Sequence, residues 1–274
     1  MSAVLAVTRR EVRAAVRSSW LAGYAIIFTA LALTLAFLGE RNLGDVGFEN
    51  FSRTTASLLN LCLLLAPLVA LLLGSGAIAG ERDRGTLTYL LAQPIDRWEL
   101  LLGKYAGVSL AIGLATLLGF GAAGLWIALM TSSMAAGTYL LFVALVLLLI
   151  LAMTGLGLIA SVLSATRVQA LGIALLVWAV AVLFFDLVLI GMVSATSLGG
   201  GGLLAALLLN PIEIARVLAI IHLEPDLQVL GPFGSYLLER LGTGGATAVL
   251  VAGLLAWIAA PVAVAAWLFE GGRD

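Results

Sequence analysis

Long runs of apolar residues, separated by short polar segments, dominate the pattern along the chain. Six runs are long enough to cross a bilayer, because about 20 residues at a rise of about 1.5 Å span its hydrocarbon core. These runs are Trp20–Leu38, Ser57–Ala79, Tyr105–Met130, Thr138–Val162, Ala170–Ile190 and Ala246–Phe269. The pattern predicts an all-α polytopic membrane protein in which residues 20–274 form a domain of six transmembrane helices.

A seventh apolar run, Leu203–Ile221, is interrupted by polar residues. It contains Asn210-Pro211 near its middle, followed by Glu213 and Arg216. A charged side chain at the centre of a lone spanning helix costs about 2.5–3.5 kcal/mol on insertion scales. We therefore expect this run to lie at the outer interface or to re-enter it, rather than to cross the membrane.

The outward-facing segment, residues 191–245, also carries the signals of a helix start. Asn210 can cap a helix that begins at Pro211, and Glu213 can pair with Arg216 on one face. The alternatives are an outer gate or docking helix and a well-capped interfacial helix with no further role, and we favour the interfacial helix.

Asp186, near the outer end of the fifth run, is an acid within a span. Acids within spans often serve a transport pathway. The alternative, which we favour, is that Asp186 is hydrated or paired at the interface, about 6 Å from the end of its run at helical rise.

Basic residues are distributed unequally between the two sides of the predicted spans. Ten of them fall on the side of the N-terminus and four on the other side. The ten are Arg9, Arg10, Arg13, Arg17, Arg82, Arg84, Arg97, Lys104, Arg167 and Arg273, and the four are Arg41, Arg53, Arg216 and Arg240. Because lysine and arginine accumulate on the cytoplasmic side, both termini and the loop 80–104 are predicted to be cytoplasmic.

Composition excludes several classes of protein. The chain has 274 residues, of which 62% are hydrophobic and 11% charged, so its apolar surface cannot be hidden inside a soluble domain. The net charge of −1 gives no reason to expect a nucleic-acid partner. Cys62 and His222 are each the only residue of their type, which argues against a disulfide framework, a metal site and an intramembrane enzyme. An ion-coupled transporter needs several mid-membrane acids, whereas Asp186 is the only acid within the six runs.

Residues 1–19 have the pattern of a cytoplasmic basic amphipathic helix. Four arginines share one arc of a helical wheel, and five apolar residues share another. The arginines are Arg9, Arg10, Arg13 and Arg17, and the apolar residues are Val4, Leu5, Val12, Ala15 and Val16. The helix either lies on an anionic inner leaflet, where each arginine adds about 1 kcal/mol of attraction, or its arginines only set the orientation of the chain.

The longest polar interruption, GERDRGTL at residues 80–87, has the outline of a phosphate-binding loop. Such a loop needs a lysine that reaches the β- and γ-phosphates, and it follows a strand of a soluble sheet. Here the lysine is missing and a membrane helix precedes the stretch. We therefore expect no nucleotide or other cofactor to be bound by this chain.

The residues that follow predict a short helix beneath the membrane. Gly85 can end the second span, and Thr86–Ala92 can form about two helical turns before Pro94 stops them. Such a helix, flanked by charged residues, is suited to docking of a soluble partner protein. The alternative is a connecting loop, but four large apolar side chains are unusual for a free loop; they are Leu87, Tyr89, Leu90 and Leu91.

The stretch GERDRGTLTYLLAQPIDRWELLLGKY resembles the loop between the second and third spans of ABC-2 type transporter permeases. Three further stretches, GFENFSRTTASLLNLCLLLAPLVALLLG (Gly47–Gly74), FFDLVLIG and NPIEIARVL, resemble the NosY-like branch of that family. Members of this branch are permeases of the transporter for maturation of nitrous oxide reductase. The resemblance covers nearly the whole chain and implies a six-span, type V exporter-like fold.

By position, the resemblance also implies which residues contact an ATPase subunit. Thr86–Ala92 would be the coupling helix, and Glu81 and Arg84 would support it through charge contacts. The whole implied set is Glu81, Arg84, Gly85, Thr86, Leu87, Tyr89, Leu90, Leu91, Ala92, Pro94 and Arg97.

The partners follow from the same resemblance. Two permease copies would pair in the bacterial inner membrane, and two ATPase copies, which bind ATP and Mg, would dock below them. A periplasmic accessory protein would face the outer segment, and the cargo would be a sulfur species for copper-site assembly. Export of another substrate, such as a lipid, drug or polysaccharide, and a purely mechanical output are alternatives that the residues leave open.

Overall fold

The structure is a computed structural model that describes residues 3–41, 47–130, 136–185, 199–223 and 231–271. Within these ranges the regular elements are all helices. They are α1 (Ala3–Val16), α2 (Ser19–Arg41), α3 (Gly47–Asp83), α4 (Leu87–Leu91), α5 (Arg97–Met130), α6 (Ala136–Leu163), α7 (Arg167–Ala179), the π-helix η1 (Val180–Phe184), α9 (Gly200–Leu208), α10 (Pro211–Leu223) and α11 (Gly231–Gly271). Helices satisfy the backbone hydrogen bonds of a segment internally, as the hydrocarbon core requires.

Six helices are long and apolar enough to cross a membrane, which confirms the predicted all-α fold with six spans. They cover Ser19–Phe37, Asn60–Asp83, Arg97–Leu129, Gly137–Leu163, Arg167–Phe184 and Glu239–Gly271. The third differs from its predicted run, because α5 begins at Arg97 and not near Tyr105. Residues 80–83 and 97–104 of the predicted loop therefore belong to the ends of the two long helices α3 and α5.

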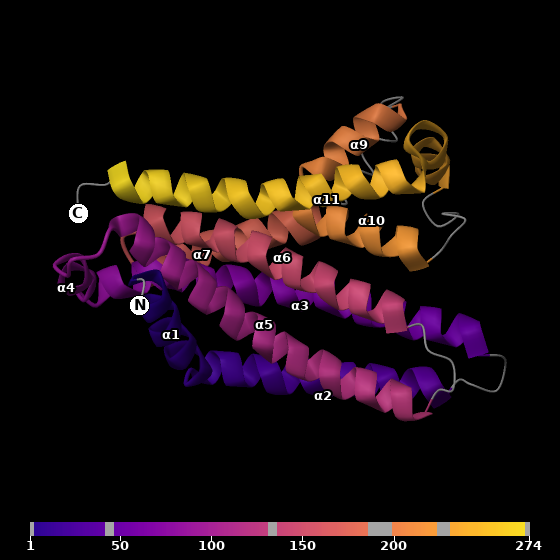
Figure 1. Ribbon diagram of the computed structural model, residues 1–274, viewed down its shortest axis with the longest axis horizontal. Coiled ribbons are helices and arrows are strands. Elements are labelled where there is room, and N and C mark those ends of the chain that lie inside the picture. Colours follow the sequence, from indigo (N-terminus) through magenta and orange to yellow (C-terminus); the bar gives the residue numbers. More distant parts are fainter. Residues whose placement is uncertain (1–2, 42–46, 131–135, 186–198, 224–230, 272–274) are drawn as a thin grey trace.

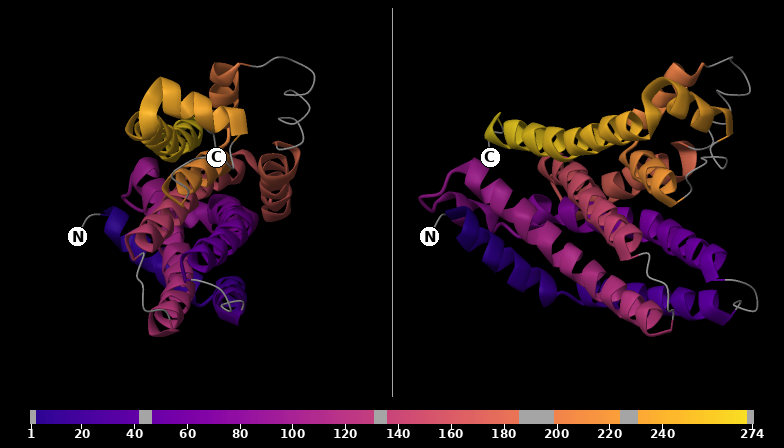
Figure 2. Two further views of the ribbon diagram at one scale, coloured as in Figure 1. Left: turned by 90° about the vertical axis from the view of Figure 1, so that its right-hand side faces the viewer. Right: turned by 45° about the vertical axis from the view of Figure 1, so that its right-hand side comes forward.

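The long helices run alongside one another, so the molecule has two distinct ends (Figure 1). The start of α1, all of α4 and the end of α11 lie at one end, whereas α9 and α10 lie toward the other. The right-hand view in Figure 2 shows the same separation from a second direction. Which end faces the cytoplasm stays a prediction.

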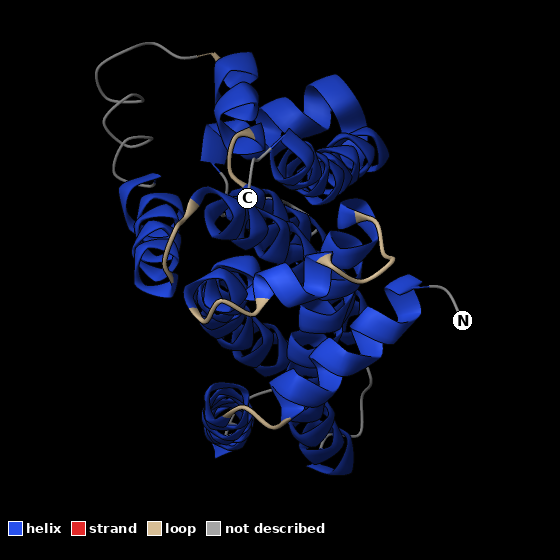
Figure 3. Ribbon diagram, turned by 90° about the vertical axis from the view of Figure 1, so that its left-hand side faces the viewer, coloured by secondary structure: helices blue, strands red, loops and turns tan. Residues whose placement is uncertain are grey.

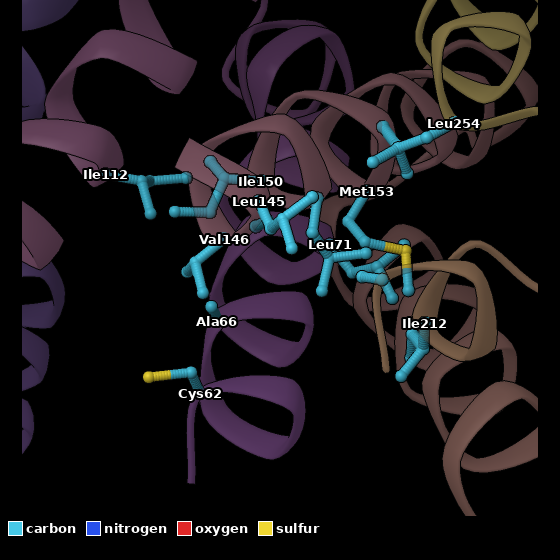
Figure 4. Packing of buried hydrophobic residues seen from close by; sticks show 14 of the residues in the cluster. Cys62, Ala66, Leu71, Ile112, Leu145, Val146, Ile150, Met153, Ile212 and Leu254 are labelled. Atoms are coloured by element: carbon cyan, nitrogen blue, oxygen red, sulfur yellow. The ribbon is translucent and has the colours of Figure 1, made fainter. Parts of the chain in front are cut away.

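The centre of the bundle is a close crossing of α3 and α6. Gly74 and Gly157 face each other, and a Cβ built on Gly157 would lie 2.7 Å from Leu71 O and 3.0 Å from Ser75 N. Small residues allow this backbone approach, which packs membrane helices tightly. Figure 4 shows Leu71, Met153 and Ile212 pointing toward one another beside this crossing.

Glycines also allow close contacts between helices elsewhere in the bundle. Phe28 of α2 packs on Gly119 of α5, and Pro261 of α11 packs on Gly155 of α6. Gly76 makes no such contact, because the nearest neighbour of an added Cβ there is the flexible Arg167 side chain at 3.9 Å. The glycine pattern alone does not distinguish a crossing point from an open position.

The seventh apolar run forms two helices, α9 and α10, that meet at a bend of 119°. Asn210 lies at the bend, where its Oδ1 accepts a hydrogen bond from Ile212 N at 3.0 Å and its Nδ2 donates to Ala181 O of η1 at 2.7 Å. The predicted N-cap at Asn210 and helix start at Pro211 are thus confirmed. The start of α9 and the end of α10 both lie toward the end away from α4 (Figure 1), although re-entry from one side stays a prediction. Asp186 lies outside the described residues.

The crossing predicts a clear difference between two Gly→Ala substitutions. Gly157→Ala places a methyl group against backbone atoms of α3, so the free energy of unfolding should fall by about 1–3 kcal/mol through overpacking. Gly121→Ala is the control, because nothing lies within 4 Å of its added Cβ. Denaturant titration of the purified protein in detergent measures both. Equal stability of the two variants would contradict the crossing.

Candidate functional site

Gly85 turns the chain out of α3 and into the short helix α4. Its φ of 69° lies in the left-handed region, and two hydrogen bonds join Gly85 N to Arg82 O at 3.0 Å and Thr86 N to Glu81 O at 2.9 Å. This pair of bonds is the Schellman motif that commonly ends a helix at glycine. The sequence predicted both the break at Gly85 and the helix over Thr86–Ala92.

The side chains of α4 divide into an anchor and an outward face. Leu87 is only 3% exposed and belongs to the main core, while Leu90 and Leu91 are half-buried against it. Tyr89 is 77% exposed, and Ala92 and Pro94 beside it are also exposed. The expectation that all the apolar residues of this helix face a partner is wrong for Leu87, because one side of α4 must pack on the bundle.

A buried ionic cluster lies at the base of the loop that carries α4. Lys104 of α5 is 1% exposed, and its Nζ lies 2.9 Å from Glu81 Oε1 of α3 and 3.0 Å from Glu11 Oε1 of α1. Arg10 Nη2 approaches the same Glu81 oxygen at 3.6 Å. Two acids and two bases make the cluster formally neutral, as burial of charge requires. The cluster joins the two long helices that flank α4.

Helix α1 packs on α5 beside this cluster. Gly103 and Gly107 of α5 give it room, since an added Cβ at Gly103 would lie 2.6 Å from Val7 Cβ. Thr8 Oγ1 donates a hydrogen bond to Gly103 O at 3.3 Å. The face of α1 that packs on the protein is thus centred on Val7, Thr8 and Glu11, and not on the predicted apolar arc, of which Leu5 and Val16 remain exposed.

Two arginines extend the base of the loop to α6 and α11. Arg82 Nη1 donates to Ser164 O at 2.6 Å and to Val162 O at 3.1 Å, at the end of α6. Arg97 Nη1 donates to Phe269 O of α11 at 2.9 Å, and its guanidinium lies 5.6 Å from the centre of the Phe269 ring. The loop is therefore fixed to α1, α6 and α11, and Figure 3 views this end of the molecule directly.

Sequence reasoning found some members of this site and missed others. Glu81 makes charge contacts as predicted, whereas Arg84 is exposed and forms no ion pair within the part of the chain that the structure describes. Glu11, Arg82 and Lys104 were missed as site residues. A signal for two of them existed: Glu11 is the single acid among the arginines of α1, and Lys104 stands inside the apolar stretch LLLGKYAGVSL.

The outer candidates that the structure describes lie on α10 or at its bend with α9, and they do not join this site. Glu213 Oε1 and Arg216 Nη1 pair at 2.8 Å, as their spacing predicted. Asn210 is 2% exposed and ties α10 to η1. Across the described ranges, His, Cys, Asp and Glu side chains form no group of three or more that could hold a metal ion.

Comparison with known proteins identifies the family to which this chain belongs. The family model described as ABC-2 family transporter protein matches residues 5–271. The chain belongs to the ABC-2 family of transporter permeases. It is similar to the "Probable ABC transporter permease protein NosY" of Stutzerimonas stutzeri, with 37% identity over 98% of this chain and 99% of that protein.

A second relative agrees with this assignment. The protein of the same description from Pseudomonas aeruginosa is 37% identical over 80% of this chain and 82% of its own length. This ABC-2 permease is thus a multi-pass membrane subunit of an ABC transporter, and a permease of that kind works with an ATPase partner. The site at α4 lies where the sequence resemblance places contact with such a partner.

The cluster at Lys104 predicts a specific pattern of stability changes. Lys104→Met leaves two buried carboxylates without their ammonium partner, which should lower the free energy of unfolding by about 3–5 kcal/mol. The triple variant Glu11→Gln, Glu81→Gln, Lys104→Met removes every charge of the trio and should recover most of that loss. Denaturant titration in detergent compares the two variants. A triple variant less stable than Lys104→Met would show that the cluster is not an ionic unit.

Proposed function

We propose that the chain is the permease subunit through which ATP hydrolysis on a separate ATPase drives movement of cargo across the membrane. In this proposal α4 is the coupling helix that seats in the ATPase. One observation carries it: a short helix presents an exposed aromatic side chain, Tyr89, while its base is fixed to the bundle by buried charge contacts. A connecting loop with no partner has no need of such a base.

The contacts of the base define the path by which displacement of α4 reaches the spans. Leu87 holds α4 to the core, and the ion pairs of Lys104 join α3, α5 and α1. Arg82 and Arg97 carry the same displacement to the ends of α6 and α11. Ion pairs and packed helices transmit rigid movement because the side chains have few alternative arrangements.

The path continues to the outer end through packed helices. Both α6 and α11 contact α10, and Trp257 Nε1 of α11 donates a hydrogen bond to Leu208 O of α9 at 2.9 Å. Asn210 joins the bend between α9 and α10 to η1. We therefore assign α9 and α10 as the element whose position responds to the ATPase, which gives Asn210, Glu213 and Arg216 a role in the outer gate. Asp186 stays a proposed pathway residue.

The assembly follows the usual symmetry of such transporters. Two copies of this chain pair in a bacterial inner membrane, and two ATPase subunits dock on the cytoplasmic face, where both termini lie. ATP and Mg bind to the ATPase, since the stretch at residues 80–87 lacks the lysine of a phosphate-binding loop. A periplasmic accessory protein faces the outer end.

The similarity to NosY-like permeases supports a proposal about the cargo of this transporter. We propose that it moves a sulfur species used in the copper site of nitrous oxide reductase. Deletion of the permease gene should then lower the acid-labile sulfide of nitrous oxide reductase purified from the same cells. An unchanged sulfide content would contradict this cargo and leave the coupling assignment intact.

Replacement of Tyr89 tests the coupling helix. Tyr89→Asp should weaken binding of the ATPase by at least about 30-fold, because a central aromatic contact is worth about 2 kcal/mol or more and a carboxylate resists burial. Co-purification of an ATPase subunit encoded beside the permease gene, followed by titration, measures the change.

Val168→Asp is the matched control for this substitution. Val168 has nearly the same exposure, 78%, and lies in the first turn of α7, where the helix dipole favours an acid. The control should bind the ATPase as the wild type does. If Tyr89→Asp also retains the ATPase at wild-type affinity, α4 is not the coupling helix.

A further inference from the structure

The outward face of α1 contains a hollow of about 550 Å³ lined by four arginines and two alanines. The lining residues are Ala6, Arg9, Arg10, Arg13, Ala14 and Arg17. The hollow lies on the side of α1 away from α5, and its four arginines are exposed. It is separate from the outward face of α4, so the proposed coupling contact does not account for it.

Helical spacing explains the form of this hollow. Arg9, Arg13 and Arg17 are four residues apart and form one row along the helix, with neighbouring Cβ atoms about 5–6 Å apart. Ala6, Arg10 and Ala14 form the adjacent row with the same spacing. The short alanine side chains leave the floor open, and the arginine side chains make the walls. A guanidinium fork on either side of such a space suits the oxygens of a phosphate, which arginine binds through paired hydrogen bonds.

The charges of this face are not balanced within the described parts of the chain. Arg9, Arg13 and Arg17 form no ion pair with any described carboxylate, while Arg10 lies 3.6 Å from Glu81. The acid of α1, Glu11, is turned the other way and held by Lys104. Like charges at this spacing destabilise a helix, so an anion in the hollow would relieve their repulsion.

The surroundings of the hollow indicate a lipid as the source of that anion. Leu5 and Val16, both exposed, lie on α1 beside the arginine row. Ser18 Oγ accepts a hydrogen bond from Leu21 N and so starts the first span directly after α1. Trp20 at that start is exposed, and tryptophan prefers the membrane–water interface. Apolar side chains, an interfacial tryptophan and a basic hollow thus lie at one level of the molecule.

We propose that this hollow binds the phosphate of an anionic glycerophospholipid of the cytoplasmic leaflet. The proposal rests on the proposed function only in placing this end of the bundle at that leaflet. Arg10 belongs both to the hollow and to the cluster of Glu81 and Lys104, so a bound head group contacts the base of the coupling loop. The lipid therefore holds α1 in place where α1 supports α3 and α5.

Native mass spectrometry of the purified full-length permease in detergent tests the proposal. Dioleoylphosphatidylglycerol should remain bound, and dioleoylphosphatidylcholine, which carries no net charge, should bind much more weakly. The triple variant Arg9→Gln, Arg13→Gln, Arg17→Gln should bind phosphatidylglycerol on the order of 100-fold less. The single variant Arg13→Gln keeps three basic residues before the first span, which preserves orientation, and should bind about fivefold less.

A charge-matched control separates this site from general attraction to anionic lipid. Arg84→Gln, Arg167→Gln, Arg240→Gln removes three exposed arginines outside α1 and should bind phosphatidylglycerol as the wild type does. Equal loss in the two triple variants, or no loss in the Arg13→Gln protein, would show that the arginines of α1 only set orientation. Displacement of the lipid by millimolar inorganic phosphate would overturn the lipid assignment in favour of a free anion. The assay contains no ATPase, so its outcome is independent of coupling.

Discussion

One buried ammonium group, Lys104 Nζ, fixes the arrangement of the end of the bundle that carries α4. A charge with 1% exposure is stable only beside opposite charges, and its two carboxylates come from Glu11 of α1 and Glu81 of α3. Three helices must therefore meet at this point. Their meeting point lies in the part of α5 that precedes its predicted apolar run, and it places α1 against Gly103 and Gly107. It also gives α4 a base that cannot move independently of α3 and α5.

The contacts at this base fix the short helix α4 to the rest of the bundle. Arg82 and Arg97 continue the contacts to α6 and α11, whose far parts pack on α10. The α3–α6 crossing at Gly74 and Gly157 makes the centre rigid, because the two backbones touch there. A displacement of α4 can thus be transmitted through packed helices to the bend at Asn210. This property supports the proposed role of α4 as a coupling helix.

The sequence predicted the features that depend on local pattern. The six spans follow from apolar runs, the turn at Gly85 from glycine chemistry, and the cap at Asn210 from the residues beside it. The features that it missed depend on contacts between distant residues: Glu11 and Lys104 are 93 positions apart. The burial of Leu87 was also missed, because a run of apolar residues on a two-turn helix does not show which side meets the bundle. The packing of α1 on α5 through a face centred on Thr8 and Glu11 was not predicted, for the same reason.

The account requires that α4 and the outer pair α9–α10 lie on opposite sides of the membrane. Single cysteines at Thr88, Ser235 and Glu270, all exposed positions, can be placed in a Cys62→Ala background and exposed to an impermeant thiol reagent in right-side-out vesicles. The account predicts that the cysteine at Ser235 is labelled at once, whereas those at Thr88 and Glu270 are labelled only after the membrane is opened. Labelling at Glu270 together with protection at Ser235 would show that α9–α10 crosses the membrane, and immediate labelling at Thr88 would place the proposed coupling helix on the wrong side.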